Sequence, residues 1–277
     1  MSEGFVIFAD GESYVKQAYL CALSLKASKN TKPICIITST PISSKQKTVF
    51  DHILGIPWYK YDESSLKVNN RWKLYHASPF DRSIVLDSDT LILNNLDYFW
   101  NYLEAFDIYF PSKVFTYRQE CVDEERNPYR KAFRANSLPN FYNVVHYFKK
   151  SAFSQEFYSW VELITNNWEL FYGQFCKEFY PKEPSMDITV AIVSKILDCD
   201  AKITNYKQEM PNLVHMKPLI QNWKNPTSCW QDRVGTYLTQ DLQLKIGNFR
   251  QSSIFHYTEN NFCSEDKIRK YEKCLEL

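Results

Sequence analysis

The sequence is poor in glycine, with six glycines among its 277 residues, about a third of the roughly 7% that average proteins contain. The fingerprint G-x-G-x-x-G, with which Rossmann folds cradle a dinucleotide, does not occur, and neither does the phosphate-binding loop G-x-x-x-x-G-K-[S/T]. These absences argue against a dinucleotide-dependent oxidoreductase and exclude a P-loop NTPase. Any phosphate bound by this chain has to be held by side chains or by a metal ion.

An excess of charge of one sign and long apolar runs are also missing. The 33 basic and 32 acidic residues nearly cancel, to a formal net charge of +1, so no overall field attracts nucleic acid. No stretch reaches the ~18 consecutive apolar residues of a membrane-spanning helix, and the N-terminus lacks the apolar region of a secretion signal. The eight cysteines are scattered without a C-x-x-C pair, which indicates reduced thiols, no zinc site and a cytoplasmic protein.

What is present is the alternation of strands and helices that is typical of an α/β protein. A short apolar run at 5–9 suits a buried parallel strand, a helix capped by Ser13 follows it, and a second strand is expected at 34–38. We therefore expect a single domain with a mixed, mostly parallel central sheet flanked by helices. The polar stretch 112–140 has no clean periodicity and is expected to be a long loop.

The most informative motif is an acidic turn, Asp87-Ser88-Asp89, between the apolar strand patterns 84–86 and 91–93. Two carboxylates so close together cannot both stay ionised in a half-buried site without a cation. Hard oxygen ligands suit Mn²⁺ or Mg²⁺. The alternative is a solvated turn whose aspartates hydrogen-bond to the local backbone, but the apolar strands on both sides favour a metal site.

The segment around this turn, WKLYHASPFDRSIVLDSDTLIL (72–93), resembles the donor site of GT-A glycosyltransferases. It is most similar to glycosyltransferase family 8, the group of glycogenin and the bacterial lipopolysaccharide galactosyl- and glucosyltransferases. Further segments resemble other parts of that family in the same order, namely 5–25, 139–151, 185–192 and 242–260. The resemblance implies a GT-A, Rossmann-like domain over 1–260, with a nucleotide-sugar half (1–110) and an acceptor half (111–260), followed by a C-terminal helix at 261–277.

In that family the two aspartates bind Mn²⁺ or Mg²⁺, which bridges the diphosphate of a nucleotide sugar, and a histidine is the third ligand. The resemblance implies Asp87 and Asp89 as the acidic ligands here. Two candidates stay open for the third ligand. His256 is favoured because the residues before it form the better final strand, whereas His215 begins a partial H-x-K-P version of the family's ending. Lys217 of that version is the expected diphosphate contact.

The remaining site residues follow from the matched segments. The residues expected beside the nucleotide and its phosphates are Ala9, Asp10, Tyr14, Arg71, Lys73 and Ser88. The residues expected to line the sugar pocket, and so to act in catalysis, are Asn140, Asn143 and Asp187. These three also have plainer interpretations, since an aspartate suits a helix N-terminus and asparagine suits the transition from a loop to a strand.

Together these features predict a metal-dependent glycosyltransferase that takes a sugar from a nucleotide sugar, with UDP as the expected carrier and with retention of configuration. The acceptor stays open between a glycan, a lipopolysaccharide-type molecule and modified DNA. The basic residues of 112–140, Arg130 among them, either contact an anionic acceptor or belong to a solvated loop. Two alternatives remain, a glycosyltransferase acting on hydroxymethylated pyrimidines in DNA and a non-catalytic module that binds glycan or nucleic acid.

Overall fold

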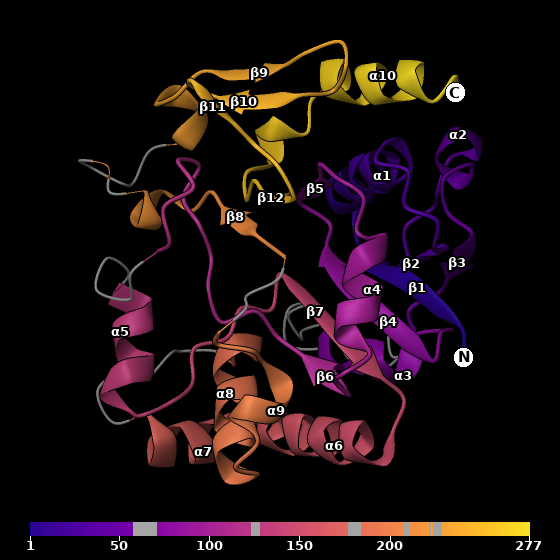
Figure 1. The fold of residues 1–277 in the computed structure, drawn as a ribbon. Helices are drawn as coiled ribbons and strands as arrows, with labels where there is room; N and C mark the ends of the chain where they lie inside the picture. The colour runs from indigo at the N-terminus through magenta and orange to yellow at the C-terminus, as the bar shows by residue number, and fades with distance from the viewer. Residues whose placement is uncertain (58–70, 123–127, 177–183, 208–210, 222, 224–228) are drawn as a thin grey trace.

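The computed structural model describes residues 1–57, 71–122, 128–176, 184–207, 211–221, 223 and 229–277. A six-stranded sheet in the order β3-β2-β1-β4-β7-β6 lies at its centre (Figure 1). In that order the strands are His52–Leu54, Ile34–Ile37, Glu3–Phe8, Arg82–Asp87, Val145–Lys149 and Ile108–Tyr109. The first four run parallel, and β7 is antiparallel to both of its neighbours. The expected mixed, mostly parallel sheet is therefore confirmed.

The central strand β1 is buried on both faces, as its apolar sequence predicts. Phe5 and Ile7 pack into one hydrophobic core, and Val6 packs into a second core on the other face. Helix α1 (Glu12–Ala27) contributes to the first core, whereas α6 (Ala152–Asn166) and α8 (Met186–Ile196) contribute to the second. The sheet is thus a middle layer between helices, and both of its faces exclude water.

Two smaller sheets lie beyond the carboxyl end of β4. One consists of β5 (Thr90–Ile92), β12 (Ile254–His256) and β8 (Leu213–His215), with β12 antiparallel to β5 and parallel to β8. The other is an antiparallel sheet of β9 (Thr236–Leu238), β10 (Leu244–Ile246) and β11 (Phe249–Arg250). The chain therefore leaves the central sheet after β4 and enters a different sheet within three residues.

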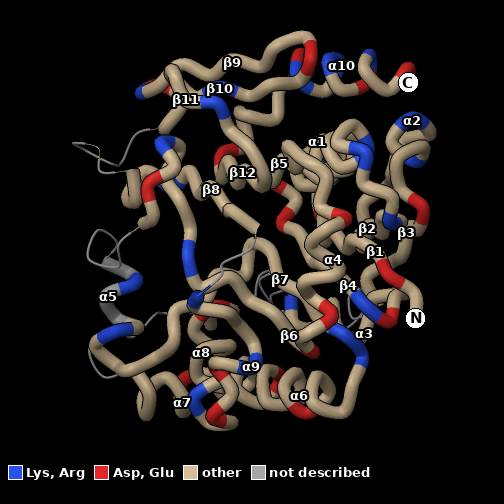
Figure 2. Tube along the Cα trace, viewed as in Figure 1, with Lys and Arg blue, Asp and Glu red and all other residues tan. Residues whose placement is uncertain are grey.

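Shorter helices complete the layers. The α-helices are α2 (Ser44–Lys47), α3 (Leu74–Ala77), α4 (Asp97–Leu103), α5 (Pro128–Ala135), α7 (Trp168–Phe175), α9 (Asp200–Ile203) and α10 (Glu265–Cys274). The 3-10 helices are η2 (Arg71–Lys73), η4 (Pro218–Ile220), η5 (Trp230–Asp232) and η6 (Asn260–Phe262). Both signs of charge are scattered over these elements (Figure 2). Within the described ranges, no helix combines the length and the apolar character that crossing a bilayer requires.

Two local expectations are wrong. Helix α1 begins at Glu12 with Gly11 as its N-cap, so Ser13 lies in the first turn and caps nothing. Gly11 has φ 102°, a value that glycine adopts readily.

The stretch 112–140, expected to be a loop, contains helix α5, which begins at Pro128, a residue that suits a first helical position. Residues 123–127 of this stretch lie outside the described residues. Its periodicity is hidden because Arg130 is buried, at 3% exposure, rather than solvated.

Candidate metal and donor site

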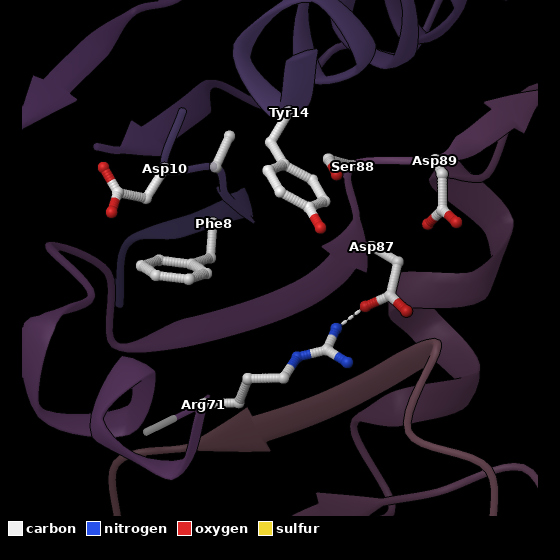
Figure 3. Close-up of a pocket in the computed structure, with 8 residues that line it drawn as sticks. Phe8, Asp10, Tyr14, Arg71, Asp87, Ser88 and Asp89 are labelled. Atoms are coloured by element: carbon white, nitrogen blue, oxygen red, sulfur yellow. Dashed lines mark ion pairs between the residues drawn. The ribbon is translucent and has the colours of Figure 1, made fainter. Parts of the chain in front are cut away.

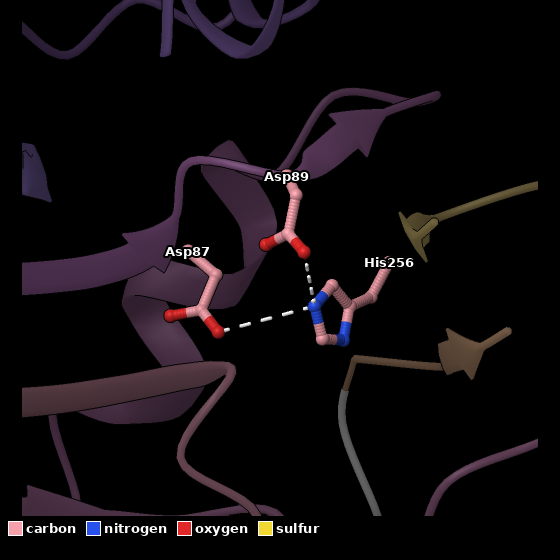
Figure 4. A group of neighbouring side chains, drawn as sticks. All are labelled: Asp87, Asp89 and His256. Carbon is pink, nitrogen blue, oxygen red and sulfur yellow. Dashed lines mark ion pairs between the residues drawn. The ribbon is translucent and has the colours of Figure 1, made fainter. Parts of the chain in front are cut away.

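The acidic turn lies where the chain passes from the central sheet to the β5-β12-β8 sheet. The hydroxyl of Thr90, the first residue of β5, donates a hydrogen bond to the backbone carbonyl of Asp87 at 2.7 Å. Ser88 donates to the side-chain oxygen of the buried Gln17 of α1 at 3.2 Å. These contacts hold the turn, and the carboxylates of Asp87 and Asp89 both point toward β12 (Figure 4).

Asp87, Asp89 and His256 form a group whose ligand atoms all lie within 4.8 Å of one another. Nε2 of His256 lies 3.0 Å from Oδ2 of Asp89 and 4.0 Å from Oδ2 of Asp87. The three side chains are largely withdrawn from solvent. Two carboxylates with one imidazole make a donor set that fits a divalent cation such as Mn²⁺ or Mg²⁺, and the nitrogen ligand favours Mn²⁺.

The carboxylates in this group carry charge. Burial raises the pKa of Asp89, but the charge of His256, the hydrogen bond from His256 and the charge of Arg71 outweigh it, so the pKa lies below its ordinary value. Asp87 forms an ion pair with Arg71 (Figure 3). Among the described residues, Arg71 and His256 are the partners of these two carboxylates, and a bound metal ion would add positive charge between them.

His215, the other candidate for third ligand, lies behind His256 rather than in the group. The two histidines are directly paired in the adjacent strands β8 and β12. Their Nδ1 atoms are 2.6 Å apart, so the ring edge of His256 that faces the aspartates is the Nε2 edge. Of the two histidines, the structure brings His256 to the aspartates.

A pocket of about 210 Å³ opens beside the acidic turn (Figure 3). It is lined by Phe8, Ala9, Asp10, Tyr14, Arg71, Asp87, Ser88 and Asp89. Six of these were expected beside the nucleotide or the metal from separate segments of the sequence, and Arg71 was expected together with Lys73. The carboxyl end of β1, the start of α1 and the end of β4 supply most of this lining, because parallel strands end at the same edge of a sheet.

Arg71 and Lys73 lie on different sides of the short helix η2. Arg71 is partly buried and lines the pocket, where withdrawal from water lowers the pKa of its guanidinium and the charges of Asp89 and Asp187 oppose this effect. An arginine stays protonated at neutral pH despite such burial. Lys73 lies over the ring of Trp72, with 5.5 Å from Nζ to the ring centroid, and borders a separate depression with His76. Of the pair, only Arg71 lines the pocket of the acidic turn.

The residues expected around the sugar form a second cluster, organised by Arg130. The guanidinium of Arg130 pairs with Asp187 at the start of α8 and donates to Oδ1 of Asn140 at 2.9 Å. Its face lies 3.8 Å from the ring centroid of Tyr142. Asn140 also donates to the carbonyl of Ser112 at 2.9 Å. The side chain of Asn140 is therefore engaged in holding the loop together.

Asn143 differs from Asn140 in the hydrogen bonding of its side chain. Its backbone N–H donates to Oδ1 of Asp187 at 3.0 Å, which fixes its position. Its side chain is buried, with the residue 4% exposed, and neither Oδ1 nor Nδ2 has a hydrogen-bond partner among the described residues. Buried amides are almost always hydrogen-bonded in folded proteins. Asn143 therefore has unused donor and acceptor capacity, as a ligand contact requires.

The structure also brings in two residues that sequence reasoning did not select. Gln17 joins the acidic turn to the segment after β12, since its Nε2 donates to Oδ1 of Asn260 at 2.7 Å while its Oε1 accepts from Ser88. Arg130 was expected only as one of the basic residues of 112–140, either at an anionic acceptor or in a solvated loop. No local motif marks either residue, because each acts on partners far along the chain. Lys217 is exposed just after β8. Burial and the charge of His256 lower the pKa of His215, and the charge of Lys217 adds to this effect.

Solved glycosyltransferases share this fold. The galactosyltransferase LgtC in complex with donor and acceptor sugar analogs aligns with a TM-score of 0.51 at 13% identity, over 99% of this chain and 96% of that chain. An active-site mutant of LgtC aligns with a TM-score of 0.51 at 11% identity, over 99% and 95%. Mouse xyloside xylosyltransferase 1 gives a TM-score of 0.48 at 11% identity, over 94% and 99%. No protein-family model and no curated protein matches the sequence. The LgtC alignments show that this chain has the GT-A fold.

Proposed function

We propose that this protein is a metal-dependent glycosyltransferase that transfers a sugar from a uridine diphosphate sugar to an acceptor. The observation that carries the proposal is the overlap of two features. Asp87 and Asp89 belong both to the group with His256 and to the lining of the pocket that Asp10 and Tyr14 share. A nucleotide in this pocket would have its base near the start of α1 and its phosphates against the metal ligands.

Asp10 and Tyr14 suit a uracil base. Tyr14 is 48% exposed at the pocket, so one face of its ring is available for stacking. Asp10 is buried and its Oδ1 accepts hydrogen bonds from the hydroxyls of Ser39 and Thr40, which hold its carboxylate in place. A carboxylate only accepts hydrogen bonds. Uracil presents a ring N–H where cytosine presents an acceptor, so this position favours UDP over CDP.

The same end of the pocket suits the leaving diphosphate. A divalent ion held by Asp87, Asp89 and His256 would act as a Lewis acid that stabilises the charge developing on the diphosphate. Arg71 pairs with Asp87 and adds fixed positive charge at this end. Lys217, exposed beyond β8, would supply a further point charge to the phosphates.

Asn143 and Asp187 would bind the transferred sugar. The unused amide of Asn143 can both donate to and accept from sugar hydroxyls. Asp187 fixes the backbone of Asn143 and stays 22% exposed in its side chain, so it can accept a further hydroxyl. The resemblance to glycosyltransferase family 8 implies retention of the anomeric configuration, which nuclear magnetic resonance of the product would test.

The acceptor proposed first is a glycan, because LgtC, which shares the fold, is crystallised with an acceptor sugar analog. A lipopolysaccharide-type acceptor belongs to the same chemical class. The competing acceptor is hydroxymethylated DNA. Incubation of the protein with radiolabelled UDP-sugars and each of these acceptors separates the cases, since the label enters only the acceptor that is used.

The deciding experiment is a thermal-shift and calorimetric screen of UDP, CDP and their sugars with Mn²⁺, Mg²⁺ or EDTA. A ligand that binds only the folded state at 100 times its Kd raises the unfolding free energy by about 2.7 kcal/mol. We expect UDP to raise the melting temperature in Mn²⁺ and to do so much less in EDTA. Binding of a glycan without any effect of metal or nucleotide would contradict the proposal and indicate a binding module.

A further inference from the structure

His215 is a buried histidine that lies directly behind the ligand His256. The two residues face each other across the parallel pair β8 and β12. Both are buried, at 4% and 6% exposure, so the contact between them is shielded from water. The backbone of His215 is held in turn, since Gln221 donates to its carbonyl at 2.6 Å. The contact between the two histidines is therefore a buried, fixed feature at the base of the candidate metal site.

The two rings meet edge to edge. Their Nδ1 atoms are 2.6 Å apart, their ring centroids are 4.6 Å apart and their planes differ by 24°. Two rings stacked face to face cannot bring ring atoms this close, so the contact lies near the plane of both rings. This is the geometry of one hydrogen bond, with a single proton between the two nitrogens.

The direction of this hydrogen bond follows from the other edge of His256. A histidine that binds a metal ion through Nε2 carries its proton on Nδ1. His256 therefore donates through Nδ1, and His215 accepts through Nδ1. The direction is the same when His256 is doubly protonated beside Asp89, because Nδ1 then carries a proton as well.

We propose that His215 is a positioning residue, which accepts the Nδ1–H of His256 and so fixes the tautomer and the ring orientation in which Nε2 of His256 binds the metal. The inference rests on the proposed function. Metal-binding histidines commonly donate to a carboxylate or a carbonyl in this way. An imidazole in that place leaves the charge at the site unchanged, so Asp87 and Asp89 alone supply the negative charge.

Titration calorimetry of Mn²⁺ binding to the full chain tests the proposal through three variants. His215→Asn puts an amide oxygen close to the position of Nδ1 and should keep the Mn²⁺ affinity within about threefold of the parent protein. His215→Leu removes the acceptor and His215→Gln displaces it, so each should weaken Mn²⁺ binding by roughly 10- to 100-fold. His52→Leu, on the exposed edge strand β3, is the control and should bind Mn²⁺ as the parent does.

Comparing Mn²⁺ affinity with the metal-free melting temperature separates a role of His215 in positioning His256 from a role in stabilising the fold. We expect the metal-free melting temperature of His215→Gln to stay within a few degrees of that of His215→Asn while their Mn²⁺ affinities differ. Equal affinity in the parent, Asn, Gln and Leu variants would overturn the inference and leave the proposed function standing. If the leucine variant does not fold, the Asn and Gln pair decides alone. A parent protein that binds no Mn²⁺ overturns both the inference and the metal dependence of the proposed function.

Discussion

The two ends of the proposed donor site are built in opposite ways. At the metal end, the carboxylates of Asp87 and Asp89 point at His256, and Arg71 pairs with Asp87. At the sugar end, the carboxylate of Asp187 is already engaged by Arg130 and by the backbone of Asn143, and the free polar groups are those of the Asn143 amide. The metal end presents two carboxylates and an imidazole as a set of ligand atoms, whereas the sugar end presents the neutral amide of Asn143.

The difference matches what each end would bind. A metal ion and a diphosphate carry several charges, and recognising them needs charged ligands. Sugar hydroxyls are neutral donors and acceptors, and a fixed amide matches both roles. The ion pair of Arg130 and Asp187 then holds the backbone of Asn143, and so its amide, in position. Removing a charge at the metal end should therefore affect activity, and removing one at the sugar end should affect stability first.

Asp89→Asn should produce the largest effect on activity. The substitution keeps the shape of the side chain but removes one of two negative ligands. We expect UDP-sugar hydrolysis and transfer to fall by about 1,000-fold, since metal stabilisation of the leaving group is worth several kcal/mol. Mass spectrometry of released UDP measures the rate, and circular dichroism checks the fold. Asp266→Asn, at an exposed position of α10, should retain full activity. A metal-dependent reaction would be contradicted if Asp89→Asn turned over as fast as the parent protein in buffer that contains excess EDTA.

Arg130→Met should have the largest effect on stability. It leaves the carboxylate of Asp187 without its buried cation, and breaking such a pair costs about 3 kcal/mol of unfolding free energy. Urea denaturation measures the loss. The matched control is Lys149→Met, which breaks the half-exposed pair with Asp107 and should cost less than about 1 kcal/mol. Similar losses in the two variants would mean that the Arg130 pair is no more than a surface ion pair.

Asn143→Leu should separate stability from activity. Because neither side-chain amide atom of Asn143 has a hydrogen-bond partner in the described part of the chain, replacement by leucine should raise the unfolding free energy by about 1 kcal/mol. The same change should lower kcat/KM by at least roughly tenfold, since the sugar loses its hydrogen bonds. Asn140→Leu is the counterpart, and it should lower stability because it removes the bonds to Arg130 and Ser112. If Asn143→Leu is less stable than the parent, the amide has a structural role instead.

At neutral pH the smallest expected effect is that of His146, which changes only the pH dependence of stability. Burial, with the charge of Arg71, lowers its pKa from 6.5 to about 3 in the folded protein. Between these values the unfolded chain binds a proton that the folded protein does not, so stability falls as the pH drops below about 6.5 and is unaffected above it. His146→Phe should make the loss shallower by up to about 1.4 kcal/mol per pH unit between pH 6 and pH 4. Parallel denaturation curves over this range would show that His146 is not buried in its neutral form.

The acidic turn at the metal end could be predicted from the sequence because the residues that mark it are neighbours in the chain. Asp87, Ser88 and Asp89 are consecutive and flanked by apolar strands, and the strand ends near Ala9 and Asp87 meet because β1 and β4 run parallel. The sequence favoured His256 as the third ligand but left His215 open. Both lie at the ends of short strands, and only the pairing of β12 between β5 and β8 sets one histidine in front of the other.

The sugar end was less accessible to sequence reasoning. Arg130 pairs with a residue 57 positions away, and its type alone suggests a solvated surface. Arg71 and Lys73 are two residues apart, so on a helix they point in different directions, but the sequence does not say which of them faces the site. Asn140 and Asn143 look equivalent as sequence, and only the contacts of their side chains separate a structural amide from an available one.

The passage of the chain from the central sheet into the β5-β12-β8 sheet has a consequence for how the protein matures. Asp87 and Asp89 leave the ribosome long before His256, and the strand β8 that carries His215 also follows most of the chain. Contacts between segments so far apart in the chain are slow to form, because closing the long loop between them costs entropy. A nascent chain therefore holds the acidic turn before His256 is made, and the candidate metal site needs β12 to lie between β5 and β8. The time course of Mn²⁺ uptake during refolding would then report when this final step occurs.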